Sequence, residues 1–260
     1  MAERNSKPET EGEIARAPRF RDSLVVITGV GKDGQTGAAL ADAFAAEGAA
    51  VVLLGREEEN LDARQASLRA RGATVSTFVC DLTNLEQVTE VGRRVAAAAQ
   101  PTDTRAAGRI DALVNVAGGF AMSGSIGSAD LATFQRQIEI NLTTAFVASR
   151  VFVPLVRDGG SVVYFASAAA LPGARSAQMS AYTAAKAAVL GLMQSIADEV
   201  KSRRVRVNAV APTAIRTGDN VREMGSGARY VDLTAVAGAV MFLSSPAAAA
   251  ITGQVLRLGD

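Results

Sequence analysis

The sequence predicts an α/β protein: one domain in which a seven-stranded parallel sheet is doubly wound, with helices on both faces. The first observation is that, from residue 23 onward, short β-branched runs alternate with longer Ala-rich segments of helical period, as in repeated βαβ units. The second is that every segment between two runs is long enough for a right-handed crossover helix. The third is that the seven runs fill the chain and leave no interval for a second domain.

Each strand prediction rests on a run of β-branched or other apolar residues bounded by turn-forming residues. In chain order the predicted strands are Leu24–Ile27, Ala50–Leu54, Thr74–Val79, Ala112–Val116, Ser161–Phe165, Arg206–Val210 and Gln254–Leu258. The intervening segments have helical spacing and helix-favouring composition, and they predict helices near 37–48, 58–71, 84–99, 129–157, 181–203 and 234–244. In such a sheet the ligand crevice lies beyond the carboxyl ends of the strands, so the residues that follow each strand are the candidates for a site.

Composition excludes several classes of function. Lys plus Arg number 27 and Asp plus Glu number 26, so the net charge of +1 gives no general basic field for nucleic acid or an anionic bilayer. The chain has no histidine, which excludes a Ser-His-Asp triad, a Cys-His pair and histidine-ligated zinc, and no metal site is expected. The single cysteine, Cys80, cannot form an internal disulfide, which fits a reducing compartment.

The N-terminal segment has the composition of a flexible tail. Residues 1–22 hold five basic and five acidic side chains and no apolar stretch for a signal peptide. We therefore expect a tail over residues 1–19, a folded domain over 20–260, and a cytoplasmic protein. No membrane span is expected, because even the apolar run TAFVASRVFVPLV is interrupted by Arg150.

A glycine-rich loop follows the first predicted strand. Residues 28–37 read TGVGKDGQTG and lead into an amphipathic helix. The glycines Gly29, Gly31, Gly34 and Gly37 allow a tight turn and a close approach of the backbone to a pyrophosphate, whose charge is met by free N–H groups at the helix start. The position of this loop, directly after the first strand, favours dinucleotide binding over an ordinary connecting turn.

The residues after the second strand indicate which dinucleotide is bound. Where an NAD-preferring site carries an acidic residue for the ribose 2′-hydroxyl, this chain has Arg56. Its guanidinium can pair with a 2′-phosphate, and Lys32 in the glycine loop can assist. NADP(H) is therefore the preferred cofactor, with NAD(H) as the alternative, because three neighbouring glutamates, Glu57 to Glu59, can instead neutralise a solvated Arg56.

A candidate proton-transfer set lies farther along the chain. Tyr182 and Lys186 are four residues apart at a helix start, so their side chains share one face, and the lysine can favour the phenolate needed for acid-base chemistry. Ser167 follows the fifth strand, where its hydroxyl can reach a substrate carbonyl, although serine there is also common turn chemistry. Asn141 is a poor helix former at an interior helix position.

Together these motifs resemble the short-chain dehydrogenase/reductase family over about residues 23 to 260, which implies a Rossmann-type fold. The loop TGVGKDGQTG, the segment CDLT at 80–83, the stretch NVAG at 115–118 and the segment NAVAPTAIRT at 208–217 occur in the family's order, and ITGQ at 251–254 also matches. Asn141, Ser167, Tyr182 and Lys186 resemble its catalytic tetrad.

The resemblance implies a role for each residue. Tyr182 exchanges a proton with the substrate oxygen, Ser167 orients that oxygen, and Lys186 binds the nicotinamide ribose and lowers the Tyr182 pKa. Asn141 positions a water that links Lys186 to solvent. The remaining cofactor contacts implied by the family are Asp81 and Leu82 at the adenine, Asn115, Ala117 and Gly118 at its ribose side, and Pro212, Ile215 and Thr217 around the nicotinamide.

The expected activity is NADP(H)-dependent interconversion of a carbonyl and an alcohol, either a 3-oxoacyl reductase-like reaction or a small-ketone reduction. The sequence departs from the family pattern in the glycine loop, which is two residues longer and has Gln35 in place of the middle glycine. That departure motivates the alternative of a non-catalytic NAD(P)-binding sensor or structural subunit. The segment 218–231 is expected to form a short lid over the substrate, and the resemblance implies a homotetramer or homodimer.

Overall fold

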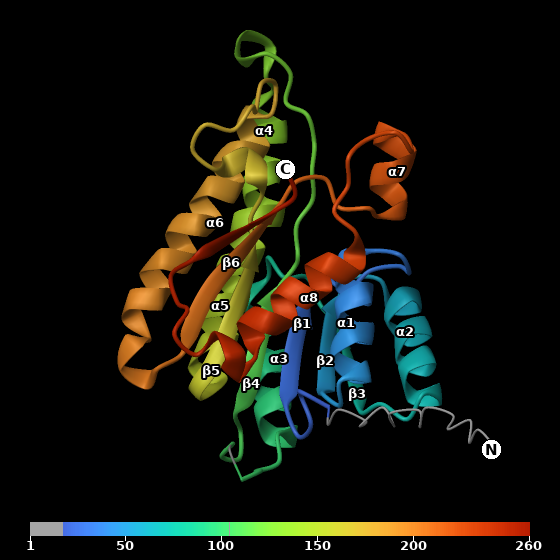
Figure 1. Ribbon diagram of the computed structural model, residues 1–260, viewed down its shortest axis with the longest axis vertical. Coiled ribbons are helices and arrows are strands. Elements are labelled where there is room, and N and C mark those ends of the chain that lie inside the picture. The colour runs from blue at the N-terminus through green and yellow to red at the C-terminus, as the bar shows by residue number, and fades with distance from the viewer. Residues whose placement is uncertain (1–17, 104) are drawn as a thin grey trace, which may run out of the picture.

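The computed structural model describes residues 18–103 and 105–260 and confirms the predicted fold class. Seven parallel strands form one sheet in the order β3-β2-β1-β4-β5-β6-β7. The order reverses between β1 and β4, which lie side by side in the sheet (Figure 1). In open sheets of this kind the loops that leave two such strands turn to opposite sides and frame a ligand crevice.

The observed strands agree with the prediction in number and order. They are β1 (Leu24–Thr28), β2 (Ala50–Gly55), β3 (Val75–Val79), β4 (Ile110–Asn115), β5 (Val156–Phe165), β6 (Arg206–Pro212) and β7 (Val255–Leu258). The helices of the described residues are α1 (Thr36–Ala46), α2 (Glu58–Ala70), α3 (Leu85–Ala98), α4 (Leu131–Ile138), α5 (Thr144–Phe152), α6 (Ser180–Glu199), α7 (Gly218–Met224) and α8 (Leu233–Ser244).

Alternation along the strands divides the core into two layers. In β1, Val25 and Ile27 pack into a cluster with side chains of α1, α2 and α8, whereas Val26 faces the cluster formed with α3, α5 and α6. In β2, Leu53 and Leu54 divide between the two clusters in the same way. Because both faces of the sheet are covered, every residue of β4 and β6 is buried, as is typical of central parallel strands.

The single helix predicted over 129–157 is the main correction to the expected elements. The structure breaks it into α4, a π-helical segment at Glu139–Thr143, α5 and a 3-10 turn at Val153–Leu155. The π segment contains Asn141, and π segments inside helices occur frequently at functional sites. The fifth strand begins at Val156 rather than at the predicted Ser161, because Val156 already pairs with Ile110 across a register shift in β4 and β5.

The run Leu131–Leu155, with a mean hydropathy of 1.3, is long and apolar enough to cross a membrane by length and composition alone, contrary to the simpler expectation from Arg150. Core helices meet the same criterion, and this run packs against α3 and α6.

At the N-terminus, most of the predicted tail lies outside the described residues. Arg19 at its end forms an ion pair of 2.7 Å with Glu47, and Phe20 belongs to the core.

The segment between β6 and α8 forms a separate feature above the carboxyl edge of the sheet (Figure 1). Its base is closed where Ile215 bridges to Val231 and the Arg216 N–H donates to the Val231 carbonyl at 2.9 Å. Between these points the chain forms α7, which the sequence did not predict as a helix. Thr217 caps α7 by accepting from the Asn220 N–H at 3.2 Å.

Candidate active site and dinucleotide pocket

A cavity of about 540 Å³ opens at the carboxyl ends of β1, β2, β3 and β4, a size in the usual range of ligand pockets. Its walls come from the glycine loop, from the residues that follow the other three strands, and from α4 and the start of α5. The lining residues from the predicted cofactor set are Gly29, Gly31, Lys32, Gly37, Arg56, Asp81, Leu82, Ala117 and Gly118.

The glycine loop fits a bound pyrophosphate at this cavity. Gly29 has a φ of +71°, and a Cβ there would lie 2.5 Å from the Ala117 Cα, so the residue must be glycine. A Cβ on Gly37 would lie 2.5 Å from the Gly29 carbonyl oxygen, which lets the start of α1 approach the turn. Gly31 has open space where its Cβ would stand, so the loop backbone is exposed to a ligand. These features form a cradle of the kind that dinucleotide phosphates occupy.

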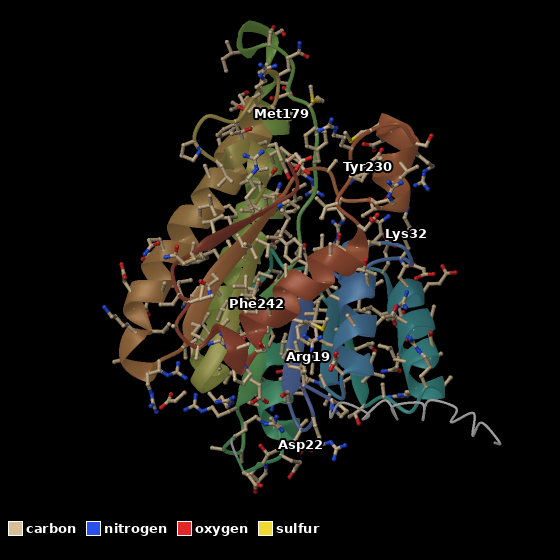
Figure 2. The ribbon with its side chains drawn as sticks, viewed as in Figure 1. Arg19, Asp22, Lys32, Met179, Tyr230 and Phe242 are labelled. Atoms are coloured by element: carbon tan, nitrogen blue, oxygen red, sulfur yellow. The ribbon has the colours of Figure 1, made fainter. Side chains whose placement is uncertain are left out.

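Lys32 does not point freely into the cavity as the sequence analysis expected. Its ammonium group forms an ion pair of 2.9 Å with Asp219 of α7, and Gln35 donates to the other carboxylate oxygen at 2.9 Å. Arg222 pairs with the same carboxylate. Figure 2 shows Lys32 below α7, on the loop that leads into α1. An ion pair therefore links the glycine loop to α7. Asp33, the residue after Lys32, forms a second ion pair of 2.5 Å with Arg64 of α2.

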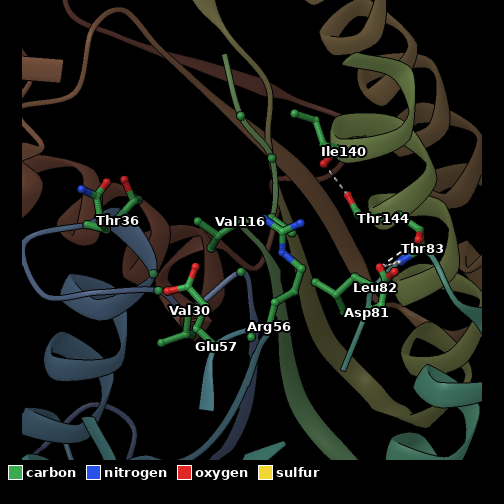
Figure 3. Close-up of a pocket in the computed structure, with 18 of the residues that line it drawn as sticks. Val30, Thr36, Arg56, Glu57, Asp81, Leu82, Thr83, Val116, Ile140 and Thr144 are labelled. Atoms are coloured by element: carbon green, nitrogen blue, oxygen red, sulfur yellow. Dashed lines mark hydrogen bonds between the residues drawn. The ribbon is translucent and has the colours of Figure 1, made fainter. Parts of the chain in front are cut away.

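Arg56 occupies the position expected for recognition of a 2′-phosphate. Its side chain projects into the cavity between Val116 and Leu82 (Figure 3), and within the described part of the chain it has no hydrogen bond or ion pair. Opposite it, the Asp81 carboxylate accepts from the Thr83 N–H at 2.9 Å and from the Thr83 hydroxyl at 2.8 Å, and these bonds hold the pKa of Asp81 below its usual range. This end of the cavity therefore offers one unpaired guanidinium and one fixed carboxylate.

A second cavity, of about 200 Å³, continues from the first toward α6 and the lid. Tyr182, Lys186, Pro212, Ile215 and Thr217 of the predicted set line it. Phe120, which follows β4, also lines this cavity, and its ring packs edge-on against Tyr182 with ring centroids 5.0 Å apart. The second cavity is therefore the place where a substrate oxygen can meet the Tyr182 hydroxyl.

Burial sets the protonation of the two titrating groups. It raises the pKa of Tyr182, and a hydrogen bond from Ser167 opposes that rise only in part. Desolvation of the phenolate dominates the net shift of this pKa, and the expected lowering by Lys186 stays a prediction. Burial also lowers the pKa of Lys186 to about 8, and its ammonium group donates to the Phe165 carbonyl at 2.8 Å. At neutral pH the site thus holds a protonated phenol beside a buried lysine.

Asn141 fixes the loop that follows β4 through two hydrogen bonds to Gly119. Its side-chain N–H group donates to the Gly119 carbonyl at 2.9 Å and to the Gln137 carbonyl at 3.0 Å, and its oxygen accepts from the Gly119 N–H at 3.2 Å. Gly118 separates Asn141 from Lys186, since a Cβ there would lie 2.5 Å from the asparagine oxygen and 3.1 Å from the lysine nitrogen. Both groups therefore crowd the position that a Gly118 side chain would occupy, so only glycine leaves room for them.

Four residues of the predicted set do not line either cavity: Gly34, Asn115, Asn141 and Ser167. Gly34 has a φ of +72° and serves the turn of the loop. Asn115 is buried at the end of β4 beside the Tyr164 hydroxyl. Asn141 and Ser167 lie behind the lining residues, Asn141 against Gly119 and Ser167 against Tyr182.

Sequence reasoning missed other residues that the structure brings to the cavities. The Asp219 carboxylate binds both Lys32 and Gln35. Arg136 of α4 lines the first cavity and pairs with Glu139 at 2.7 Å, and Phe120 packs on Tyr182. No local pattern marks these residues, because each reaches the site through a contact far away in sequence or along one helix face. For Phe120 there was one signal, an aromatic residue directly after NVAGG.

Comparison with known proteins agrees with this geometry. The short chain dehydrogenase family profile matches residues 23–225. The 2-(S)-hydroxypropyl-CoM dehydrogenase 3 of Xanthobacter autotrophicus is 33% identical over 258 residues, which cover 92% of this chain and 96% of that protein. A solved short-chain type dehydrogenase/reductase from Mycobacterium ulcerans matches with a TM-score of 0.82 and 29% identity over 92% of this chain and 89% of its own.

A structure from Beutenbergia cavernae, with NADP bound at low occupancy, matches with a TM-score of 0.79 and 29% identity over 93% of this chain and 97% of its own. The fold, the family match over most of the chain and the full-length relatives agree. This chain belongs to the short-chain dehydrogenase/reductase family, oxidoreductases that act on alcohol and carbonyl groups with NAD(P).

Proposed function

We propose that this protein is an NADP(H)-preferring reductase of carbonyl compounds that uses Tyr182 as its general acid. The observation that carries the proposal is the second cavity, which Tyr182 and Lys186 line beside the dinucleotide cradle, with Ser167 directly behind Tyr182. A bound nicotinamide supplies or accepts the hydride. The protein's own groups hold the substrate oxygen and move the proton.

In this mechanism Tyr182 donates its proton to the carbonyl oxygen as that oxygen gains charge, and removes it in the reverse reaction. Ser167 donates a hydrogen bond to the same oxygen and orients it. Lys186 binds the nicotinamide ribose through its ammonium group, which is already held in place by the Phe165 carbonyl. Because the pKa of Tyr182 is raised, the phenol is protonated at neutral pH, which suits carbonyl reduction.

Two observations support a preference for NADP(H). Arg56 projects into the adenosine end of the cavity with no ion-pair partner among residues 18–103 and 105–260, so its guanidinium is free to bind a 2′-phosphate. A relative of 29% identity carries bound NADP. Lys32 contributes to NADP(H) binding only when a cofactor phosphate displaces Asp219 from its ammonium group.

The substrate falls into one of two groups in this proposal, 3-oxoacyl compounds or small ketones. The name of the Xanthobacter relative specifies a secondary alcohol, and this is consistent with either group.

We also propose a homo-oligomer in the cytoplasm. For the oligomer, the support is a set of exposed apolar side chains on α4 and α5, which are Leu131, Phe134 and Phe146. Light scattering after size-exclusion chromatography measures the mass directly.

The test of the proposed function is the Tyr182→Phe variant on a panel of ketones and 3-oxoacyl thioesters with NADPH. We expect the wild type to turn over at least one substrate and the variant to lose about a thousandfold in kcat, while the Kd for NADPH is unchanged. NADPH binding without turnover on the whole panel by the wild type would instead favour the alternative of a non-catalytic NAD(P)-binding sensor.

A further inference from the structure

Helix α6 begins without a capping side chain of its own. The first N–H groups of a helix have no intrahelical acceptor, and a serine, threonine, aspartate or asparagine at the preceding position usually supplies one. Here that position is Met179, which makes no side-chain cap (Figure 2). Tyr182 lies in this first turn, so whatever holds the turn also sets the position of its phenol.

Ser123, from the loop between β4 and α4, supplies the missing acceptor. Its hydroxyl oxygen accepts from the Ala181 N–H at 3.4 Å and lies 3.1 Å from the Ser180 hydroxyl. The same hydroxyl donates to the Gln178 carbonyl at 3.2 Å, and the Ser123 N–H donates to that carbonyl at 2.8 Å. A serine hydroxyl has one proton and two lone pairs, so these three contacts use all of its hydrogen-bonding capacity.

Ser123 is buried, and Gln178, which accepts its hydrogen bonds, has an unusual backbone conformation. Ser123 is only 8% exposed, although its neighbours Met122 and Ser125 are exposed. Gln178 has a φ of +62°, a conformation that non-glycine residues rarely adopt, and it is the residue whose carbonyl receives both bonds from Ser123. The bend that leads into α6 therefore depends on a partner that is distant in sequence.

The same loop reaches the tyrosine at a second point. Phe120 packs on the Tyr182 ring at an interplanar angle of 86°. Just before it, Gly119 is held on both its N–H and its carbonyl by Asn141. The loop 119–123 thus spans from the buried asparagine to the start of α6, with the tyrosine between.

We propose that Ser123 is a positioning residue for Tyr182: by capping α6 from the loop after β4, it holds the phenol at the distance from Ser167 that proton transfer requires. The inference rests on the proposed function. Ser123 itself lines neither cavity and does not touch the reacting atoms.

The experiment compares Ser123→Ala with Ser123→Thr, which keeps a hydroxyl, and with Ser180→Ala, which removes only the exposed partner. Ser125→Ala is the matched control, because Ser125 lies two residues farther along the loop and bonds only with Ser128 at 2.9 Å. The probes are cyclohexanone and acetophenone with NADPH, and cyclohexanol with NADP⁺. Circular dichroism and the Kd for NADPH are measured for every variant.

We expect Ser123→Ala to fold, to bind NADPH within about twofold of wild type, and to lose about tenfold in kcat with little change in KM for the ketone. In alcohol oxidation its pH profile moves to higher pH, because a displaced phenol loses the hydrogen bond from Ser167 that opposes the rise in its pKa. Ser123→Thr restores most of kcat, Ser180→Ala shows a smaller loss in kcat, and Ser125→Ala matches the wild type.

Three results overturn the inference. In the first, Ser123→Ala keeps wild-type kcat and pH profile while the wild type is active, which leaves the proposed function intact. In the second, kcat falls in proportion to lost NADPH binding or to unfolding, and Ser180→Ala has no effect. In the third, the wild type binds NADPH but turns over none of the probes and none of the wider ketone and 3-oxoacyl panel, which removes the proposed function as well.

Discussion

The two ends of the site are built in different ways. At the proton-transfer end, Asn141 and Lys186 are 1% and 5% exposed, lie on helices and hydrogen-bond to backbone carbonyls. At the phosphate end, Lys32 has a side chain that is 51% exposed and pairs with Asp219, which is 38% exposed, while Arg56 has no hydrogen bond or ion pair within the described chain and interacts with Asp81 only at longer range. The first end is held by burial and the second by exposed charges on loops.

This difference indicates how each end responds to a ligand. Buried hydrogen bonds to backbone cost much to break, so the proton-transfer geometry exists before a cofactor arrives. Exposed ion pairs contribute little and are screened by salt, so a cofactor phosphate can exchange with Asp219 at Lys32. We therefore expect changes at the buried end to alter kcat, and changes at the exposed end to alter cofactor affinity with a marked dependence on salt.

After Tyr182→Phe, the largest effect is expected from Gly118→Ala at the buried end. The added Cβ would lie 2.5 Å from the Asn141 oxygen, so that asparagine and the neighbouring lysine must move. We expect a loss of about a hundredfold in kcat, measured by NADPH oxidation with the best ketone of the panel. Gly191→Ala in α6, where the Cβ meets nothing within 4 Å, is the control. Wild-type turnover in Gly118→Ala would show that the buried end is not preorganised.

The pH dependence of the two reaction directions tests the raised pKa of Tyr182. Alcohol oxidation needs the phenolate, whose fraction grows about tenfold per pH unit below the pKa, so its kcat should rise from about pH 6 to about pH 9. Ketone reduction uses the protonated phenol and should stay level near neutral pH. Initial rates in both directions measure this. An oxidation rate that is level over the same range would contradict a raised pKa.

A smaller effect is expected from Arg56→Ala at the exposed end. Loss of the guanidinium should raise the Kd for NADPH about tenfold, or about 1.4 kcal/mol, and leave the Kd for NADH unchanged. Fluorescence titration of both cofactors measures it, with Lys201→Ala, an exposed lysine in the turn after α6, as the control. Equal weakening of both cofactors would remove the assignment of a 2′-phosphate contact.

The smallest effect is expected from Asp219→Asn. The variant frees Lys32 and removes a negative charge from the phosphate cavity, so the Kd for NADPH should fall about twofold to threefold at low salt. The gain should diminish as salt increases, because screening weakens the original pair. Titrations of wild type and variant at two ionic strengths give the change in the Kd for NADPH and its dependence on salt. Weaker NADPH binding in Asp219→Asn would mean that the carboxylate helps to hold the loop in its binding form.

Most elements could be predicted because their signals are local. β-branched runs that alternate with Ala-rich segments marked all seven strands, and the parallel arrangement of the strands follows from the length of the connections between them. The break in the helix around Asn141 had only a weak signal, since a π segment is stabilised by the contacts of the asparagine with Gly119 rather than by helix propensity. Helix α7 was missed because a seven-residue helix depends on its cap and on Asp219 more than on periodicity.

The sequence by itself determined the fold class, the glycine loop and the pairing of Tyr182 with Lys186 on one helix face, because residue type and spacing carry that information. Asn141 and Ser167 joined this predicted set through the family resemblance. Only the tertiary structure decided which charged side chains form ion pairs and which hydroxyl caps the start of α6. It turned Lys32 toward Asp219, raised the pKa of Tyr182 through burial, and brought Ser123 to the start of α6. These outcomes depend on desolvation and on contacts between segments up to 187 residues apart, and local sequence patterns contain neither.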